Sequence, residues 1–150
     1  MANVKVGDKA PEFSLTSSKQ KVVNLADLKG KKVILSFYPV AFTPVWENQV
    51  SSLEENFDNI QNANATALAI SIDSPYANGA WAEKIGVKNT TLLSDFWPHG
   101  QVASQYGAFR DKEGIAERAN VVLDENHNII FFKIYNLDEQ PNMEEVYGLL

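Results

Sequence analysis

Short runs of apolar and β-branched residues alternate along the chain with stretches whose apolar positions recur at helical spacing. The run at residues 33–38 is apolar apart from one serine and is rich in β-branched and aromatic residues. This pattern predicts a strand that is buried on both faces. Similar runs predict further strands at residues 22–25, 66–72, 91–93, 120–123 and 129–132. Turn-forming segments at residues 17–20 and 124–128 predict one hairpin near the N-terminus and a second late in the chain.

A helix is predicted directly after the strand at residues 33–38. Thr43 is a suitable N-cap, and Pro44 suits the first helical position because its missing N–H leaves no hydrogen bond unmade there. Apolar residues then recur at helical spacing at Val50, Leu53, Phe57 and Ile60. Further helices are predicted at residues 75–85 and 98–106, and the abrupt end of the pattern at residues 143–150 predicts a short helix there. Strands that alternate with helices predict one α/β domain over residues 1–150, with a central mixed sheet flanked by helices.

Composition excludes several classes of function. The formal net charge of −6 argues against binding of nucleic acid, which needs clustered Lys and Arg. No apolar run approaches the roughly 20 residues that span a bilayer, and the N-terminus lacks an apolar segment of signal-peptide length. We therefore expect a cytoplasmic protein that does not enter membranes. No nucleotide-binding glycine motif is present, so we expect no cofactor.

The chain contains no cysteine and only two histidines, His99 and His127, whose helix-start and turn contexts predict surface positions. The missing cysteines exclude disulfides, thiolate metal sites and thiol nucleophiles. A metal site made of several histidines is not expected either.

The most informative segment is the junction at residues 37–46, where a buried strand leads into the start of a helix. Free backbone N–H groups and the helix dipole favour an anion at such a point. A thiol in the first turn would have a lowered pKa and be a reactive thiolate at neutral pH. The Thr43 hydroxyl is able to cap the helix or to hydrogen-bond a ligand oxygen. Taken alone, these residues favour the simpler interpretation of an ordinary helix start.

Four segments, in this order along the chain, resemble the peroxiredoxins. They are residues 6–13, the junction with Pro39 and Thr43, residues 92–100 together with 106–109, and residues 118–124. The Ala41-Phe42-Thr43 form of the junction and the third segment are similar to the alkyl hydroperoxide reductase E branch. The resemblance implies a thioredoxin-like fold with an N-terminal hairpin extension, and a homodimer. It also implies reduction of hydrogen peroxide and organic hydroperoxides by a thiol.

The resemblance assigns roles to individual positions. Trp46 stands in the register of the peroxidatic cysteine. Thr43 would hydrogen-bond the peroxide, and Pro39 would shield the pocket from water. Arg118 would stabilise the thiolate and the charge that develops on the leaving oxygen.

Three further positions would support the site. Gln49, one helical turn after Trp46, would orient Arg118. Phe42 and Trp81 would form apolar walls of the pocket, although ordinary core packing is the simpler explanation for both.

At Trp46 the sequence departs from the family pattern, and this departure removes the nucleophile of the peroxidase reaction. An indole is no substitute for a thiolate nucleophile, and no other thiol exists in the chain, so we expect no peroxidase turnover. A laboratory substitution of the cysteine is favoured because Pro39, Thr43 and Arg118 are intact. The alternative is a natural protein without catalysis that binds a ligand or partner on the same fold.

The resolving step also has two interpretations. A cysteine-bearing parent would depend on an external thiol such as thioredoxin, a glutaredoxin-like protein or a small thiol. Ser51 lies where one branch of the family has a resolving cysteine, and either a native serine or a second substitution explains it.

Trp46 is also expected to affect structure and assembly. An indole forced into a cysteine-sized pocket would cost about 1–3 kcal/mol. We therefore expect the first turn of the helix to unwind or shift, and the dimer contact beside it to weaken or change.

Overall fold

The computed structural model describes residues 4–150, and for residues 44–46 it describes the backbone alone. Its centre is a seven-stranded mixed sheet in the order β2-β1-β5-β4-β3-β8-β9. The central strands β3, β4 and β5 run parallel, and the other neighbours pair antiparallel. The strands of this sheet are β1 (Ser14–Ser17), β2 (Val22–Asn24), β3 (Lys32–Phe37), β4 (Ala65–Ser71), β5 (Thr91–Ser94), β8 (Arg118–Leu123) and β9 (Ile129–Tyr135). A separate two-stranded pair is formed by β6 (Phe109–Arg110) and β7 (Ile115–Ala116).

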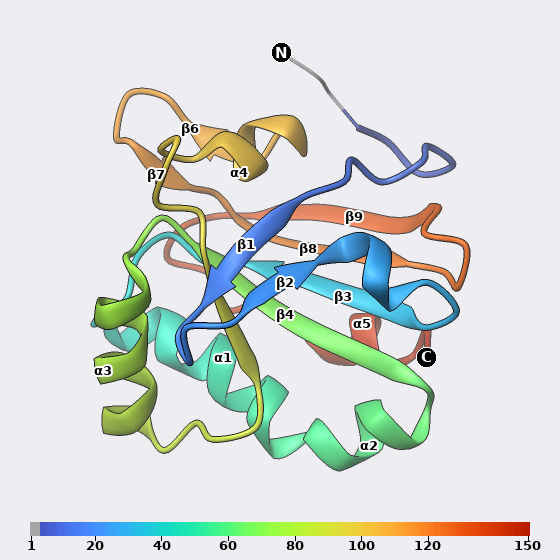
Figure 1. Ribbon diagram of the computed structural model, residues 1–150, viewed down its shortest axis with the longest axis horizontal. Coiled ribbons are helices and arrows are strands. Elements are labelled where there is room, and N and C mark those ends of the chain that lie inside the picture. The colour runs from blue at the N-terminus through green and yellow to red at the C-terminus, as the bar shows by residue number, and fades with distance from the viewer. Residues whose placement is uncertain (1–3) are drawn as a thin grey trace.

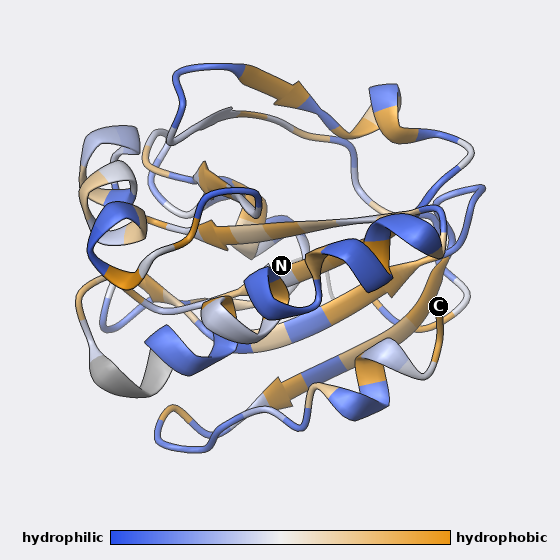
Figure 2. Ribbon diagram, turned by 90° about the horizontal axis from the view of Figure 1, so that it is seen from below, coloured by the Kyte–Doolittle hydropathy of each residue, from blue (hydrophilic) through white to orange (hydrophobic). Residues whose placement is uncertain are grey.

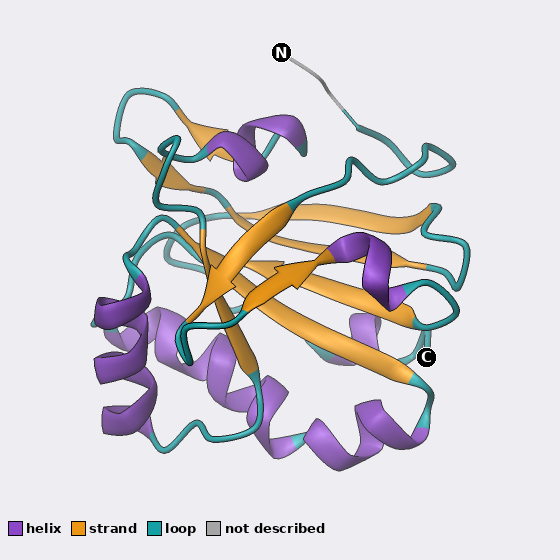
Figure 3. Cartoon of the chain, viewed as in Figure 1, coloured by secondary structure: helices purple, strands orange, loops and turns teal. Residues whose placement is uncertain are grey.

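Helices cover both faces of the sheet (Figures 1 and 3). The helices are η1 (Leu25–Leu28), α1 (Pro44–Glu55), α2 (Phe57–Asn62), α3 (Pro75–Ile85), α4 (Gln101–Gln105) and α5 (Glu144–Tyr147). Apolar residues of α1, α2, α3 and α5 join the core on one face, and those of η1 and α4 join the core on the other. Within the described part of the chain, no helix is long and apolar enough to cross a membrane.

Alternation along the central strands separates the two cores. In β3, Val33, Leu35 and Phe37 face the core beneath η1 and α4, while Ile34 faces the core beneath α1. Successive side chains of a strand point to opposite faces, so a strand covered on both sides must be apolar throughout. Figure 2 shows the strands coloured mostly as hydrophobic, whereas the helices carry hydrophilic and hydrophobic bands. The prediction of a doubly buried strand at this place is confirmed.

Most predicted elements are present, and the differences have local causes. The predicted helix pattern from Val50 to Ile60 is divided at Asn56, which separates α1 from α2. The Asn56 side chain and its own backbone N–H both donate to the Ser52 carbonyl, at 2.9 and 3.1 Å. Such local side-chain hydrogen bonds compete with the continuing helix.

Two short strands were not predicted, and one predicted helix is longer than the helix observed. The pair β6–β7 has strands of two residues each, too short to produce a periodic pattern. The helix expected at residues 98–106 is limited to the five residues of α4. The terminal helix is short, as expected, and consists of the four residues of α5. A turn context predicted a surface position for His127, which is wrong: its side chain is buried, and its Nε2 lies 3.0 Å from the Leu28 carbonyl oxygen.

Candidate active site at the start of helix α1

The loop at residues 38–43 connects the end of β3 to α1 and is held in place from the end of β4. The backbone N–H of Ala41 donates to the Asp73 carboxylate at 2.9 Å. The same carboxylate oxygen accepts a hydrogen bond from the Ser71 hydroxyl at 2.7 Å. Phe42 then takes a positive φ of 67°, a conformation that non-glycine residues rarely adopt. These contacts determine where the chain enters α1.

Thr43 is the N-cap residue of α1, with extended backbone angles of −124° and 137°. Its hydroxyl does not cap the helix but donates to the Val40 carbonyl at 3.0 Å. The first-turn N–H groups of α1 are therefore not satisfied by this side chain. Together with the helix dipole, they favour negative charge at the helix start.

Trp46 is the third residue of α1, and its side chain lies outside the described residues. The backbone is helical from Pro44 onward, so the expectation that the first turn unwinds is wrong, whereas a shift of that turn stays a prediction. Proline at the first position fits the helical φ angle. The next turns are anchored because Val50 and Leu53 are fully buried. The expected effect of Trp46 on assembly stays a prediction.

Arg118 is the first residue of β8 and is fully buried. Phe37, the last residue of β3, pairs with Ala119, so Arg118 lies at the end of the sheet from which the chain enters α1. Burial lowers the pKa of Arg118 to about 10, and the nearby charges of Asp138 and Glu139 oppose this shift. The guanidinium therefore keeps its positive charge at neutral pH.

Gln49 ties the second turn of α1 to the end of β3. Its side chain is buried, and its Nε2 donates to the Ser36 hydroxyl at 2.6 Å and to the Phe37 carbonyl at 3.1 Å. The predicted orienting contact of Gln49 with Arg118 stays a prediction. The observed role of Gln49 is to hold α1 against the sheet.

Phe42 and Trp81 line one small cavity beside Thr43, with a volume of about 110 Å³. Trp81 is buried and packs on the Tyr38 ring at a centroid distance of 5.2 Å. Phe42 is 52% exposed, so core packing does not explain it. The Lys84 ammonium lies 5.9 Å from the centre of the Phe42 ring, at the long end of cation–π contacts.

Comparison with known proteins identifies the family of this chain. The sequence matches the model of the AhpC/TSA family over residues 6–132. The chain belongs to this family of peroxiredoxins. It is 39% identical over 127 residues to alkyl hydroperoxide reductase E of Mycobacterium tuberculosis, an overlap that covers 84% of this chain and 82% of that protein. It is 35% identical over 147 residues to peroxiredoxin Bcp of Escherichia coli K12, covering 98% and 87% of the two chains.

The predicted thioredoxin-like peroxiredoxin fold is confirmed by a solved structure. The crystal structure of Enterococcus faecalis AhpC superposes with a TM-score of 0.89 at 27% identity, over 99% of this chain and 90% of that chain. The N-terminal hairpin of β1 and β2, the parallel centre of the sheet and the hairpin of β8 and β9 are all present in this peroxiredoxin.

Two buried polar residues beside the site were missed from sequence. Ser36 and Asn120 face each other on β3 and β8, and the Ser36 hydroxyl donates to the Asn120 side-chain oxygen at 2.8 Å. The signal was visible, because each interrupts an otherwise apolar run. Only the pairing of the two strands shows that the two interruptions meet.

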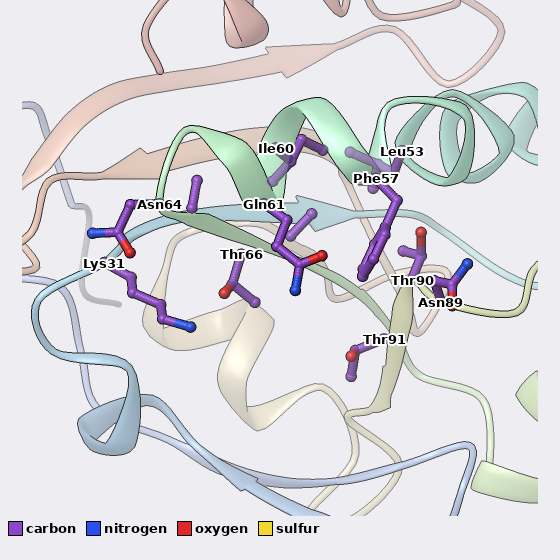
Figure 4. A pocket seen from close by; sticks show the side chains of 12 residues that line it. Lys31, Leu53, Phe57, Ile60, Gln61, Asn64, Thr66, Asn89, Thr90 and Thr91 are labelled. Atoms are coloured by element: carbon purple, nitrogen blue, oxygen red, sulfur yellow. The ribbon is translucent and has the colours of Figure 1, made fainter.

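A second, larger cavity in this peroxiredoxin lies away from the predicted site residues (Figure 4). Its volume is about 250 Å³, and it lies between α2 and the first residues of β4 and β5, with Phe57, Ile60, Thr66 and Thr91 among its walls. None of the residues that the family resemblance assigns to the site lines it.

Proposed function

We propose that this chain is a peroxiredoxin in which Trp46 occupies the position of the peroxidatic cysteine, and that it does not reduce hydroperoxides in its present form. One observation carries the proposal: a member of a thiol peroxidase family contains no cysteine in its 150 residues. A natural binding protein on the same fold is the competing possibility.

The chemistry explains why one substitution is enough. In the thiol reaction, a thiolate sulfur attacks one peroxide oxygen, the O–O bond breaks, and a sulfenic acid and a hydroxide or alkoxide result. The leaving oxygen takes a proton to become water or an alcohol. A second thiol then reduces the sulfenic acid through a disulfide. Trp46 offers only an indole N–H donor, so the first step has no nucleophile.

The surroundings of position 46 would stabilise a thiolate there. The start of a twelve-residue helix supplies N–H groups that the Thr43 side chain does not cap, and a positive dipole end. A buried guanidinium, Arg118, lies at the same end of the sheet. In a cysteine-bearing form, Thr43 would hydrogen-bond the peroxide and Arg118 would stabilise the leaving oxygen. Pro39, which is buried in the loop, would limit the access of water.

The remaining features of the proposal follow the family. The substrate of the cysteine-bearing form is a hydroperoxide, and its reductant is an external thiol such as thioredoxin, a glutaredoxin-like protein or a small thiol. The protein acts in the cytoplasm as a homodimer.

Ser51 lies on α1 five residues after Trp46 and is half-buried. A resolving cysteine at Ser51 is the alternative form of the parent.

The test is to restore the sulfur. Trp46→Cys should react rapidly with hydrogen peroxide or an organic hydroperoxide in stopped-flow measurements and should form a sulfenic acid detectable by mass spectrometry. Trp46→Ser is the matched control, because it removes the indole without supplying a thiol. The present chain and the serine variant should both be inactive. A folded Trp46→Cys protein with a titratable thiol and no reaction above the serine control would favour the binding protein instead.

A further inference from the structure

A chain of buried polar side chains crosses the face of the sheet that α1 covers. From Gln49 it passes to Ser36, then to Asn120, whose Nδ2 donates to the Tyr135 hydroxyl at 3.4 Å. It ends where the Tyr135 hydroxyl donates to the Glu145 carboxylate at 2.7 Å. Gln49, Ser36, Asn120 and Tyr135 are all at least nine-tenths buried. The donors all point the same way, from α1 toward α5.

Strand register explains why these side chains meet. Ser36 pairs with Asn120 across β3 and β8, and Arg118 pairs with Tyr135 across β8 and β9. Arg118 and Asn120 are two residues apart, and residues at that spacing share a face of the sheet. The polar chain and Arg118 therefore lie on the same face.

The Glu145 carboxylate determines which group donates and which accepts in every hydrogen bond of this series. Hydrogen bonds from Tyr135 and Lys133 lower the pKa of Glu145, so the carboxylate is an acceptor at neutral pH. Tyr135 must then donate to it, which leaves the Tyr135 oxygen to accept from Asn120. The Asn120 oxygen in turn accepts from Ser36, whose own oxygen accepts from Gln49.

The orientation of the Gln49 carboxamide is thus determined twice. The Ser36 oxygen and the Phe37 carbonyl both act as acceptors here. The Nε2 of Gln49, which is the donor, must therefore face both of them. The Gln49 Oε1 is consequently turned away from β3, buried, and without a hydrogen-bond donor among the described residues. All four links from Gln49 to Glu145 are made, and hydrogen bonds between buried side chains rigidify the parts that they join.

We propose that Ser36, Asn120 and Tyr135 are positioning residues: through Gln49 they hold the first turns of α1 over the start of β8, and so set position 46 relative to Arg118. The inference rests on the proposed function, in which position 46 carries the reactive sulfur. None of the three touches the reacting atoms, so none is a catalytic residue. Their effect reaches the chemistry through the placement of the helix start.

The first arm of the test uses the Trp46→Cys protein as its background. Ser36→Ala interrupts the series of hydrogen bonds between Gln49 and Asn120. It should lower the second-order rate constant for hydrogen peroxide by about tenfold, the scale expected for slight misplacement of a reacting group. The pH profile of the reaction should also show a raised thiol pKa, because the sulfur moves relative to the helix start and the guanidinium. Ser36→Thr keeps the hydroxyl and should recover most of the rate.

A matched control separates positioning from loss of stability. Tyr106→Phe removes a buried hydroxyl that donates to the Pro11 carbonyl at 2.6 Å on the opposite face of the sheet. It should destabilise the fold by an amount similar to Tyr135→Phe, yet leave the rate constant and the pH profile unchanged. Tyr135→Phe should alter both.

A double-mutant cycle tests whether the effect travels through Gln49. In a Gln49→Met background, Ser36→Ala should have no further effect on the rate, because the link is already broken. The proposal is overturned if Ser36→Ala slows the reaction no more than Tyr106→Phe does, or slows it equally with and without Gln49.

A second arm uses the present chain, with Trp46 in place, and needs no activity. Ser36→Ala should speed amide hydrogen exchange in the first half of α1 by more than Tyr106→Phe does. Equal exchange in the two variants would contradict the positioning of α1 by the network. If Trp46→Cys proves inactive while this arm gives the expected result, the proposed function fails and the anchoring of α1 stands.

Discussion

Glu54, near the end of α1, holds the segment that leads from α3 into β5. Its carboxylate accepts hydrogen bonds from three consecutive backbone N–H groups: Lys88 at 3.0 Å, Asn89 at 3.1 Å and Thr90 at 2.8 Å. A backbone segment that carries three donors toward one point needs an acceptor there. Replacement of Glu54 should therefore loosen the connection between α1 and β5.

The magnitude follows from the kind of bond that is lost. A hydrogen bond to a charged group contributes about 1.5–3 kcal/mol, against about 0.5–1.5 kcal/mol for a neutral one. Glu54→Gln keeps one acceptor oxygen and loses the charge, and solvent reaches this half-exposed site. We expect the free energy of unfolding to fall by about 1–2 kcal/mol for Gln and by about 2–3 kcal/mol for Ala.

The effect should depend on pH in a defined direction. Partial burial acts to raise the pKa of Glu54, but the hydrogen bonds from Lys88, Thr90 and Asn89 outweigh it, and the net pKa lies below its ordinary value. A carboxyl group whose pKa is lowered by folding stabilises the folded state above its unfolded pKa. That stabilisation is lost as the pH falls through the lowered, folded pKa. The difference between Glu54→Gln and the unchanged protein should therefore shrink in acid.

Urea unfolding at neutral and at acid pH measures both effects. At neutral pH, the midpoint of Glu54→Gln should fall by about 0.5–1 M. Glu55→Gln is the matched control, because the adjacent Glu55 is exposed and its carboxylate makes no hydrogen bond or ion pair within the described part of the chain. Equal midpoints for the two variants at neutral pH, or a Glu54→Gln difference that persists unchanged in acid, would refute the reasoning.

Four further substitutions test other parts of the fold. Ser74→Ala should lower stability by about 0.5–2 kcal/mol, because the Ser74 hydroxyl caps α3. Thr43→Ala should lower stability by less, because the Thr43 hydroxyl does not cap α1. Thermal melts followed by circular dichroism compare the two variants. Leu53→Ala should cost about 2–5 kcal/mol in urea unfolding, because Leu53 is fully buried. Gly100→Ala should give little folded protein on a sizing column, because a Cβ there would collide with the Phe109 ring and Gly100 has a φ of 71°.

The sequence was a good guide to the site where the chemistry depends on neighbours along the chain. The N-cap at Thr43 and the start of α1 at Pro44 are local features, and both are present. The strand predicted at residues 120–123 is present, and it begins two residues earlier, at Arg118. The roles of Thr43, Arg118 and Pro39 in catalysis stay predictions, as does the replacement of a cysteine by Trp46.

Sequence reasoning failed where a long-range contact decides the outcome. The first turn of α1 does not unwind at Trp46, and the anchoring of the helix through Gln49 and Ser36 is visible only once α1 lies on the sheet. A shift of that turn stays a prediction. His127 lies in a turn and was placed at the surface, yet the packing of that turn against Leu28 buries it.

By itself, the sequence determined the family, the alternation of strands and helices, and the absence of any thiol, because each is encoded in residue types and their spacing. The tertiary structure alone decided that Ser36, Asn120 and Tyr135 meet beneath Gln49, and that Arg118 lies on the same face of the sheet. These residues are separated by long stretches of chain. Their contacts depend on strand register, which is set by the packing of the whole sheet rather than by any local pattern.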